Sequence, residues 1–546
     1  MTRLTFGLCW MVLCLSQVLH AQERPKLVVM VVVDQMRADY LDRFMPIFSP
    51  YGFKRLINSG FSYRNTKYAY LPTYTGPGHA SIATGSIPAV HGIVANDWWE
   101  RKEKREVYCV EDTQAKAVGL PVAAGKMSPH RLLATTLGHH VKLTLPGAKS
   151  LAIALKDRAA ILSAGHKADG VYWMEDSLGY FITSDFYAKQ LPAWVVQFNQ
   201  SKPAEQALKE DWTLLLGPEA YAAVGCEPDD SPYESTFKGE SKPVFPHRIS
   251  QIRKQYNAGL LKSLPAGNTL TLQMARAAVL GESLGKRGVT DFLTISFSST
   301  DYLGHKMGIR SVELADMYAR LDRDLGAFFQ FLDQEVGANA WTLVLTADHG
   351  AAENPGFMAA QGVPAEAIGD QWVETFNKDF QERMGIRPIG YFNNLQVHFD
   401  EQQLNYTGIR AEDVRDKVRQ FVAGLPFVAH VYSADEVRTA ANVLPWLSML
   451  ARAYFPARSG DLFLIPSPGH VEMAWQKTGT SHGAAYPFDT KVPFVLYGVG
   501  VNQGESYTAC GVEDIAVTLA EMLRVSWPNG AVGEPRMEHW QKPETR

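Results

Sequence analysis

Cysteine is scarce in this chain of 546 residues, which contains only five. Two of them lie in the apolar N-terminal stretch, and Cys109, Cys226 and Cys510 remain in the rest of the chain. Three thiols allow at most one disulfide and match no zinc-ribbon spacing. The sequence leaves open whether any two of them are linked. Any bound metal must therefore be held by His, Asp and Glu side chains.

A strong charge imbalance is also absent. The formal net charge is -4, with 20% charged and 46% hydrophobic residues, and we find no internal repeat and no low-complexity run. This composition is that of a folded globular protein and argues against disorder or a fibrous repeat. It also argues against nucleic acid as the main partner. An anionic substrate would need local cations, either metals or arginines.

Long apolar runs that could span a membrane are missing as well. The N-terminal run Leu4–Leu19 is interrupted by polar residues, follows one basic residue and ends shortly before the small residue Ala21. These features predict a secretory signal at residues 1–21, removed after Ala21. A lipoprotein signal at Cys14 is disfavoured because Leu13 stands where a small residue is expected. We therefore expect a secreted or periplasmic protein without stable membrane association after cleavage.

What the sequence does contain is a series of apolar, β-branched runs that end in polar or acidic residues. Buried parallel strands deliver residues to an active site at their carboxyl ends in this way. Together with the helical patterns between them, the runs predict an α/β fold with a central, mostly parallel sheet flanked by helices. The expected strands are Lys26–Asp34, Leu151–Lys156, Phe292–Ser299, Trp341–Ala347 and Pro493–Tyr497.

The clearest helical pattern covers Val312–Leu332, where apolar residues recur at steps of three and four. Two stretches interrupt the strand and helix rhythm. Residues 197–247 are rich in Pro, Glu, Lys and Ser and are interpreted as a surface insertion or lid. Residues 356–477 contain shorter strand candidates and are interpreted as an inserted α+β subdomain. Both belong to one expected catalytic domain, residues 22–546.

Two of the expected strands run directly into candidate metal ligands. Asp34 closes the first strand, and Asp348 and His349 follow the strand that ends at Ala347. An isolated Asp at a strand end is more often a cap or a turn residue than a ligand. The ligand interpretation gains weight because several such fragments meet at the same edge of a parallel sheet.

Two further fragments complete the candidate ligand set. Asp301 and His305 follow the strand that ends at Ser299, and their spacing puts both side chains on one face of a helical turn. His482 stands in a Ser-His-Gly loop late in the chain. Six such ligands are enough for two sites of three protein ligands each, with positions left open for catalysis. Mixed Asp and His ligation favours zinc, with manganese or iron as alternatives.

A nucleophile is expected at Thr75, in the segment LPTYTGPGHASIATG. Pro77 suits the first turn of a helix, so the pattern predicts a helix that begins here and ends near Gly85. Thr75 would then lie at a positive helix end, where backbone N–H groups and the helix dipole stabilise an alkoxide or an attached phosphate. The alternative is that Thr75 only caps the helix.

The order of these motifs resembles the alkaline phosphatase superfamily, in its phosphodiesterase and nucleotide pyrophosphatase branch. In that family the order implies one zinc on Asp34, Asp348 and His349, which also holds Thr75. It implies a second zinc on Asp301, His305 and His482. His79 and His91 match the family's motif without being assigned as zinc ligands, and they are interpreted as structural. The resemblance covers nearly the whole mature chain and rests further on Pro72, Thr73, His79, Thr84, Gly85, Pro88, His91, Gly92, Asn96, Asp97 and Trp98.

The expected substrate is a small phosphate monoester. Lys156 and Arg158 follow the strand LAIAL and are expected to project the same way from an extended segment. With Asn96 they resemble the phosphoryl-binding residues of the secreted PafA-type alkaline phosphatases, which use a threonine nucleophile. The resemblance implies two Zn²⁺ ions, a covalent phosphothreonine and binding of the phosphoryl oxygens by these three residues. We expect the enzyme to act as a monomer.

Other functions remain to be weighed. A phosphodiesterase or nucleotide pyrophosphatase could use the same metals, but its substrate needs an apolar pocket where this chain offers Lys156 and Arg158. A sulfatase is disfavoured because no C/S-x-P-x-R motif surrounds Thr75. A binding protein that has lost catalysis is disfavoured because the nucleophile and all candidate ligands are present.

Overall fold

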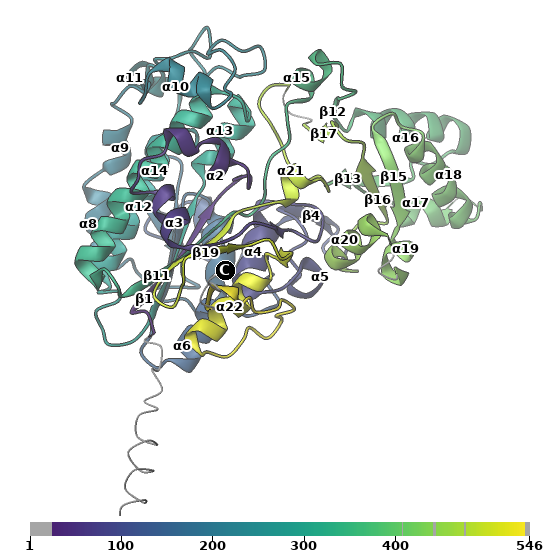
Figure 1. Cartoon of the computed structure of the whole chain (residues 1–546). Coiled ribbons are helices and arrows are strands. Elements are labelled where there is room, and N and C mark those ends of the chain that lie inside the picture. The colour runs from purple at the N-terminus through teal and green to yellow at the C-terminus, as the bar shows by residue number, and fades with distance from the viewer. Residues whose placement is uncertain (1–23, 407, 441–443, 474–476, 541–546) are drawn as a thin grey trace, which may run out of the picture.

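The computed structural model describes residues 24–406, 408–440, 444–473 and 477–540. The expected signal at residues 1–21 lies outside these residues. A large α/β body is joined to a smaller lobe, drawn green at the right of Figure 1. Among the described residues, no helix is both long and apolar enough to cross a lipid bilayer.

The large body is built on a ten-stranded sheet. Its five central strands lie in the order β11, β1, β10, β7 and β8 and run parallel to one another. Every residue in them is buried, as expected for β-branched strands that are covered on both faces. The prediction of an α/β fold with a mostly parallel sheet is confirmed. The bounds are β1 Leu27–Val33, β7 Ser150–Ala154, β8 Gly170–Met174, β10 Asp291–Phe297 and β11 Trp341–Thr346.

Strand β18 (Phe494–Gly498) differs from the prediction because it runs antiparallel to β11. The apolar run at 493–497 correctly indicated a buried strand, but the prediction of its direction was wrong. Burial sets the apolar pattern and carries no information on strand direction. The register pairs Phe494 with Thr346, the last residue of β11. The chain therefore enters β18 at the carboxyl edge of the sheet and can only run back.

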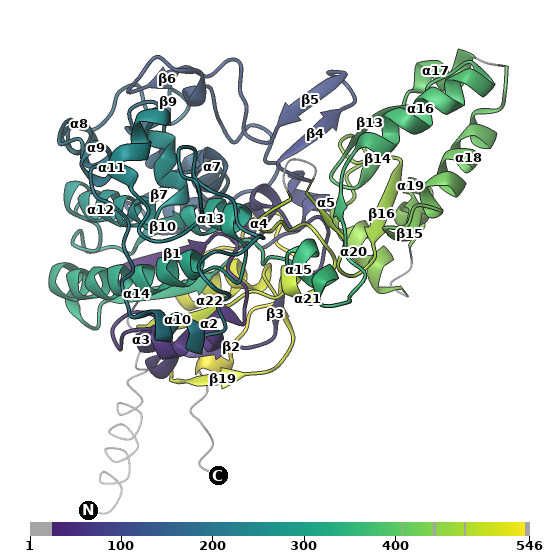
Figure 2. The same cartoon turned by 90° about the horizontal axis from the view of Figure 1, so that it is seen from above.

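Helices cover both faces of this sheet (Figure 2). Helix α7 (Asp157–Ala164) packs on β7 and β8 and contacts α4 (Thr75–Thr84). Helix α12 (Pro265–Gly281) packs on β7 and β10 and contacts α14 (Val312–Leu332). The helix predicted over 312–332 is confirmed to the residue, and its apolar stripe is fully buried in the core.

The smaller lobe is formed within residues 356–477. It contains a four-stranded sheet in the order β13, β14, β16 and β15, and a hydrophobic core of its own that includes Val397, Val414 and Val418. Its main elements are α16 Gln371–Met384, β13 Ile389–Asn393, β14 Gln396–Phe399, α18 Ala411–Ala423, β15 Val428–Ser433, α20 Pro445–Ala453 and β16 Leu462–Pro466.

The segment 197–247 is fastened to α14 by buried polar contacts. Trp212 Nε1 and Tyr221 Oη donate to the two oxygens of Asp316, at 2.7 and 2.6 Å. His247 lies between two carboxylates, with Nδ1 3.0 Å from Glu240 Oε1 and Nε2 3.2 Å from Glu313 Oε1. The segment contains the end of α8 (Ala193–Gln200), α9 (Pro203–Ala207) and α10 (Pro218–Ala223), and otherwise consists mostly of turns.

This fastening should weaken at alkaline pH. Although burial favours the neutral imidazole, the two carboxylates raise the pKa of His247 from 6.5 to about 9. Because the folded-state pKa is the higher one, the stabilisation is complete below pH 6.5 and is lost as the pH rises through about 9. We expect proteolytic cleavage within 197–247 to accelerate several-fold between pH 7 and pH 10, as followed by mass spectrometry. A rate that does not rise in the wild type, or that rises equally in His247→Gln, would contradict this assignment.

The cysteine question left open by the sequence is answered by the geometry. Cys109, Cys226 and Cys510 are all free thiols. Cys109 and Cys510 are buried, and burial raises the pKa of the Cys510 thiol to about 11. These thiols are therefore packing residues rather than metal ligands.

Candidate metal and phosphoryl-transfer site

The candidate ligands meet at the carboxyl edge of the central sheet. The register pairs Val33 of β1 with Phe297 of β10, and Val32 of β1 with Thr346 of β11. The three strands thus end at one level, and the residues that follow them come together. Asp34 follows β1, and Asp348 and His349 follow β11, all three with no exposed surface.

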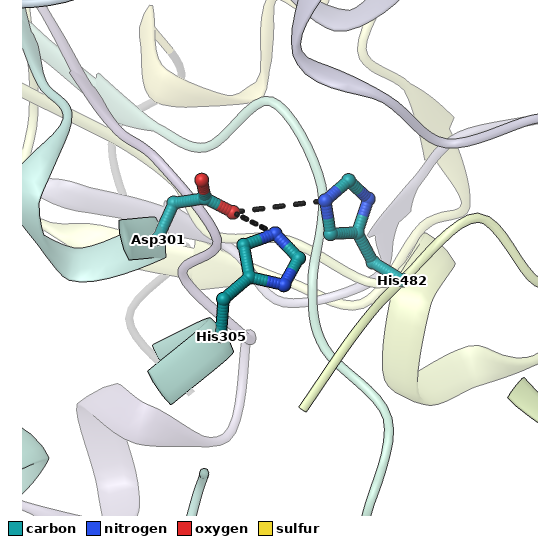
Figure 3. Close-up of side chains that lie close together, drawn as sticks. All are labelled: Asp301, His305 and His482. Carbon is teal, nitrogen blue, oxygen red and sulfur yellow. Dashed lines mark ion pairs between the residues drawn. The ribbon is translucent and has the colours of Figure 1, made fainter. Parts of the chain in front are cut away.

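The first cluster contains Asp301, His305 and His482 (Figure 3). Helix α13 (Ser299–Met307) places Asp301 and His305 one turn apart, as the spacing predicted, with His305 Nε2 3.1 Å from Asp301 Oδ1. His482 arrives from a loop far along the chain, and its Nε2 lies 3.6 Å from the same oxygen. One carboxylate and two imidazoles therefore converge on a single point.

The second cluster is formed around His349. Its Nε2 lies 3.5 Å from Asp34 Oδ1 and 3.7 Å from Asp348 Oδ2. Asp34, His349 and Asp301 also lie close enough to share one ion. Asp301 therefore stands between the two clusters, although the family order assigns it to the cluster with His305. We keep that assignment because His305 and Asp301 share one helix face.

The orientation of the three histidines fits metal binding. Nδ1 of His305, His349 and His482 lies 2.7 to 2.9 Å from a backbone carbonyl oxygen, of Thr480, Gly350 and Thr73 respectively. A carbonyl oxygen can only accept, so each Nδ1 carries the proton and each Nε2 presents a lone pair toward the centre of its cluster. Burial and the neighbouring imidazoles lower the pKa of His482 well below its usual value, which keeps the ring neutral.

Unpartnered buried atoms point to the same conclusion. Asp34 Oδ1, Asp348 Oδ2 and His349 Nε2 are buried and have no hydrogen-bond partner. Buried polar atoms normally have a partner, and three orphan acceptors around one point fit a divalent cation. A donor set of carboxylates and imidazoles without thiolates suits zinc, manganese or iron.

Lys156 is the fixed cation of the site. Its Nζ lies 2.6 Å from Asp34 Oδ2, 2.6 Å from Asp301 Oδ2 and 3.4 Å from Thr75 Oγ1. Burial opposes the charge, but these two carboxylates raise the pKa of Lys156 above its usual value. Lys156 thus links both clusters to the hydroxyl of Thr75.

Thr75 is the first residue of α4, and Gly85 ends that helix in a left-handed conformation, as predicted. The backbone donors expected to stabilise an anion at this helix end are partly occupied. Gly76 N donates to Asn96 Oδ1 at 2.7 Å, Pro77 has no N–H, and Gly78 N donates to Tyr74 O within the helix. The donors of the first turn that follow Thr75 are therefore occupied. Side chains must replace them as partners for an anion bound at this helix end.

Arg158 does not project from an extended segment beside Lys156, so that part of the prediction was wrong. Strand β7 ends at Ala154 and α7 begins at Asp157, which puts Arg158 in the first helical turn. Its Nη1 donates to Tyr108 Oη at 3.2 Å, and that hydroxyl donates to Asp157 Oδ1 at 2.5 Å. Nε of Arg158 is buried without a partner. Tyr108 thus fixes the guanidinium, a role that no sequence motif indicated.

Gln35 is a second residue that the sequence did not single out. Its Nε2 donates to Asp301 Oδ1 at 2.8 Å, and its backbone N donates to Asp348 Oδ1 at 3.1 Å. Its φ of 62° lies in the left-handed region, which is uncommon for a residue other than glycine. That conformation lets one residue orient a carboxylate of each cluster. Only its position next to Asp34 could have suggested such a role.

The two histidines interpreted as structural lie behind the nucleophile. His79 Nδ1 is 2.9 Å from Thr75 O and 3.3 Å from Asp348 Oδ2, and its Nε2 is 2.8 Å from Ser296 Oγ. His91 is buried, and its Nε2 lies 3.0 Å from Ser81 Oγ. His79 therefore connects the nucleophile helix to a ligand, whereas His91 braces the helix from its other side.

This chain is similar to known proteins over nearly its whole length. Residues 28–485 match the model of the type I phosphodiesterase / nucleotide pyrophosphatase family. The chain is 40% identical to alkaline phosphatase PafA of Elizabethkingia meningoseptica over 96% of each chain. It is 39% identical to alkaline phosphatase PhoV of Synechococcus elongatus, over 94% of this chain and 92% of that protein.

A solved structure agrees with the sequence comparisons. The crystal structure of wild-type alkaline phosphatase PafA superposes with a TM-score of 0.91 at 38% identity. The superposition covers 96% of this chain and 100% of that chain. The likeness therefore extends over the sheet, the insertion and the lobe, and not only over the ligand motifs.

Proposed function

Because this chain belongs to the type I phosphodiesterase and nucleotide pyrophosphatase family of the alkaline phosphatase superfamily, we propose that it is a metal-dependent alkaline phosphatase that hydrolyses phosphate monoesters. The observation that carries the proposal is the position of Lys156. Its ammonium contacts Asp34, Asp301 and Thr75 at once. A fixed cation between the nucleophile and both ligand clusters suits a phosphoryl group with two negative charges.

Two Zn²⁺ ions would be held by the six ligands, one by Asp34, Asp348 and His349 and the other by Asp301, His305 and His482. When bound, such ions supply Lewis acidity to the attacking and leaving oxygens of a phosphoryl transfer. The neutral imidazoles, the buried carboxylates and the orphan acceptors support this assignment.

Thr75 is the proposed nucleophile. The positive charge of Lys156, 3.4 Å from Thr75 Oγ1, favours the alkoxide over the hydroxyl. Oγ1 gives up its proton and bonds to phosphorus while the ester P–O bond breaks, and the departing alkoxide takes up a proton to leave as an alcohol. A water oxygen then bonds to phosphorus, the bond to Oγ1 breaks, and a proton from that water returns to Thr75 as phosphate leaves.

Three side chains would bind the phosphoryl oxygens. Asn96 Oδ1 accepts from Gly76, so the amide nitrogen is the end of this side chain that can donate to the substrate. Arg158, oriented by Tyr108, offers a fork of N–H donors that matches a dianion. Lys156 would neutralise a third oxygen. Together they replace the backbone donors that are occupied in the first turn of α4.

Substitution of Arg158 tests whether the enzyme prefers monoesters. For Arg158→Ala we expect kcat/KM for an aryl monoester to fall about 100-fold, because about two charge-assisted hydrogen bonds are lost. A diester carries one charge less, so its kcat/KM should fall by less than about 10-fold. Steady-state kinetics on matched aryl mono- and diesters provides the measurement.

Arg248→Ala, a change of an exposed arginine just after the insertion, is the control and should leave both rates unchanged. If the wild type prefers the diester, or if Arg158→Ala slows both substrates equally, the monoesterase proposal fails. The alternative function, a phosphodiesterase or nucleotide pyrophosphatase with the same ligands, would then be favoured.

The remaining expectations concern where the enzyme works. We propose that residues 1–21 direct export, so the mature protein acts as a secreted or periplasmic monomer on small phosphate monoesters. Cys109, Cys226 and Cys510 are free thiols, so the proposal includes no disulfide among them. The proposed substrates are not nucleic acids, in keeping with the net charge of -4.

A further inference from the structure

The loop that carries His482 packs closely against the helix that carries His305. We name residues 477–482 the His482 loop. Thr480 N donates to Gly304 O at 3.1 Å, and Thr480 O accepts from His305 Nδ1 at 2.8 Å. A Cβ at Gly479 would lie 1.9 Å from His305 O, and the φ of Gly479 is +72°. Only glycine allows this approach, so the loop and helix α13 form one packed unit.

The insertion touches this unit from outside through Tyr233 and Ser235. Tyr233 O accepts from Gly479 N at 2.7 Å, and Ser235 N donates to Lys306 O at 3.0 Å. The hydroxyl of Ser235 is hydrogen-bonded to that of Thr478. Residues 233–235, which we name the brace, therefore bind the His482 loop and the residue next to His305 at the same time.

The brace is itself held in place by buried groups. Glu234, its central residue, is 8% exposed, and Phe237 just beyond it is fully buried. The ring of Tyr233 lies edge-on to Phe357, with centroids 5.7 Å apart. Further along the insertion, His247 bonds to Glu313 of α14. The brace is thus tied to the same helical layer that supports α13, and it has little freedom to open.

These contacts lead to an inference that rests on the proposed function. We propose that residues 233–235 are a positioning device for the second metal site and that Ser235 is its main side chain. The brace sets the distance between the His305 and His482 imidazoles by holding the backbone on which each stands. The insertion was interpreted as a surface insertion or lid, and its bonds to both histidine-bearing elements favour a fixed support.

A positioning role has a specific chemical consequence. Metal affinity depends on residues behind the ligands because they preset ligand geometry. Weakening the brace should therefore affect only the site of Asp301, His305 and His482. None of the three ligands assigned to the other site, Asp34, Asp348 and His349, lies on the His482 loop or on α13.

Zinc release from the purified holoenzyme tests the proposal. With a chromophoric chelator in excess, wild type should release its two zinc ions in two phases, and His305→Ala identifies the phase of the second site. We expect Ser235→Ala to accelerate that phase about five-fold, which equals about 1 kcal/mol for one lost hydrogen bond, with the other phase unchanged. Thr478→Ala should do the same, and the double variant should be no faster than either single one.

Activity gives an independent readout. If the second site stabilises the leaving oxygen, kcat/KM of Ser235→Ala should fall about five-fold for an alkyl monoester and less than two-fold for a nitrophenyl monoester. Ser235→Thr, which keeps a hydroxyl, should restore both the release rate and the alkyl activity. Ser201→Ala, an exposed serine on the same insertion, is the matched control.

The possible outcomes distinguish a failure of the brace proposal from a failure of the proposed function. Unchanged release from the second site in Ser235→Ala, or equal acceleration at both sites, overturns the brace. So does a Ser235→Thr variant that behaves like Ser235→Ala. A wild-type protein that binds two zinc ions but hydrolyses no monoester overturns the proposed function, whatever the release rates show. Circular dichroism of each variant establishes that the fold is retained.

Discussion

Replacing Thr75 with alanine should lower the phosphatase kcat at least about 10⁴-fold, because the proposed covalent intermediate forms on the Thr75 hydroxyl. The change should leave the fold intact. Thr75 is buried at the start of α4, and its hydroxyl lies 3.4 Å from Lys156 Nζ. Steady-state kinetics and acid-quench labelling with radioactive substrate, which traps phosphothreonine in wild type and not in Thr75→Ala, provide the measurement.

Two further variants sharpen this experiment. Thr75→Ser keeps the hydroxyl and should retain labelling, with kcat within about 100-fold of wild type. Thr84→Ala removes a buried hydroxyl at the other end of the same helix, where it bonds only within the helix, and should keep nearly full activity. A Thr75→Ala enzyme with more than a tenth of the wild-type kcat would show that Thr75 is not the nucleophile.

Removing the metal should have the second large effect. Three buried carboxylates, Asp34, Asp301 and Asp348, face a single buried ammonium, that of Lys156. Chelation should therefore abolish turnover, by at least about 10³-fold, and lower the melting temperature. Saturating zinc should restore both, because a ligand present at about 1,000 times its Kd stabilises the folded state by about 4 kcal/mol. Metal analysis, activity and calorimetry on one sample test this.

A histidine pair supplies the control for metal binding. His305→Ala should lose one of two zinc ions per chain and most activity. His430→Ala, an exposed histidine on strand β15 of the small lobe, should lose neither. Full activity in protein shown to be free of metal would exclude the metal-dependent mechanism. If manganese or iron restored activity and zinc did not, the assigned ion would be wrong, whereas the assigned ligands would stand.

The sequence predicted those site residues whose placement depends on local structure, namely a strand end or a helical spacing. The ends of β1, β10 and β11 were predicted from apolar runs, and parallel pairing then required Asp34, Asp301 and Asp348 to meet. The helical spacing of Asp301 and His305 was likewise local. His482 follows no strand of the central sheet, so its place in the ligand set came from the order of motifs that resembles the family.

The sequence could not predict contacts that depend on backbone conformation. The helix that starts at Asp157 turns Arg158 toward Tyr108, and three letters such as K-D-R do not reveal that turn. Gln35 orients two carboxylates only because its φ is positive. The contacts of Tyr233 and Ser235 join residues more than 70 positions apart in a segment with weak periodicity. Such pairings are set by tertiary packing, which leaves no local pattern to read.

The position of β1 has a consequence for how the protein is made. β1 is the first strand to be synthesised, yet both of its neighbours, β10 and β11, come more than 250 residues later. At about 5 to 20 residues per second, a ribosome needs roughly 15 to 60 s to go from Val33 to Trp341. During that time the run LVVMVVV has neither partner and is an aggregation hazard. A chaperone that shields the nascent chain would therefore raise the yield of this enzyme more than that of a protein with sequential strands.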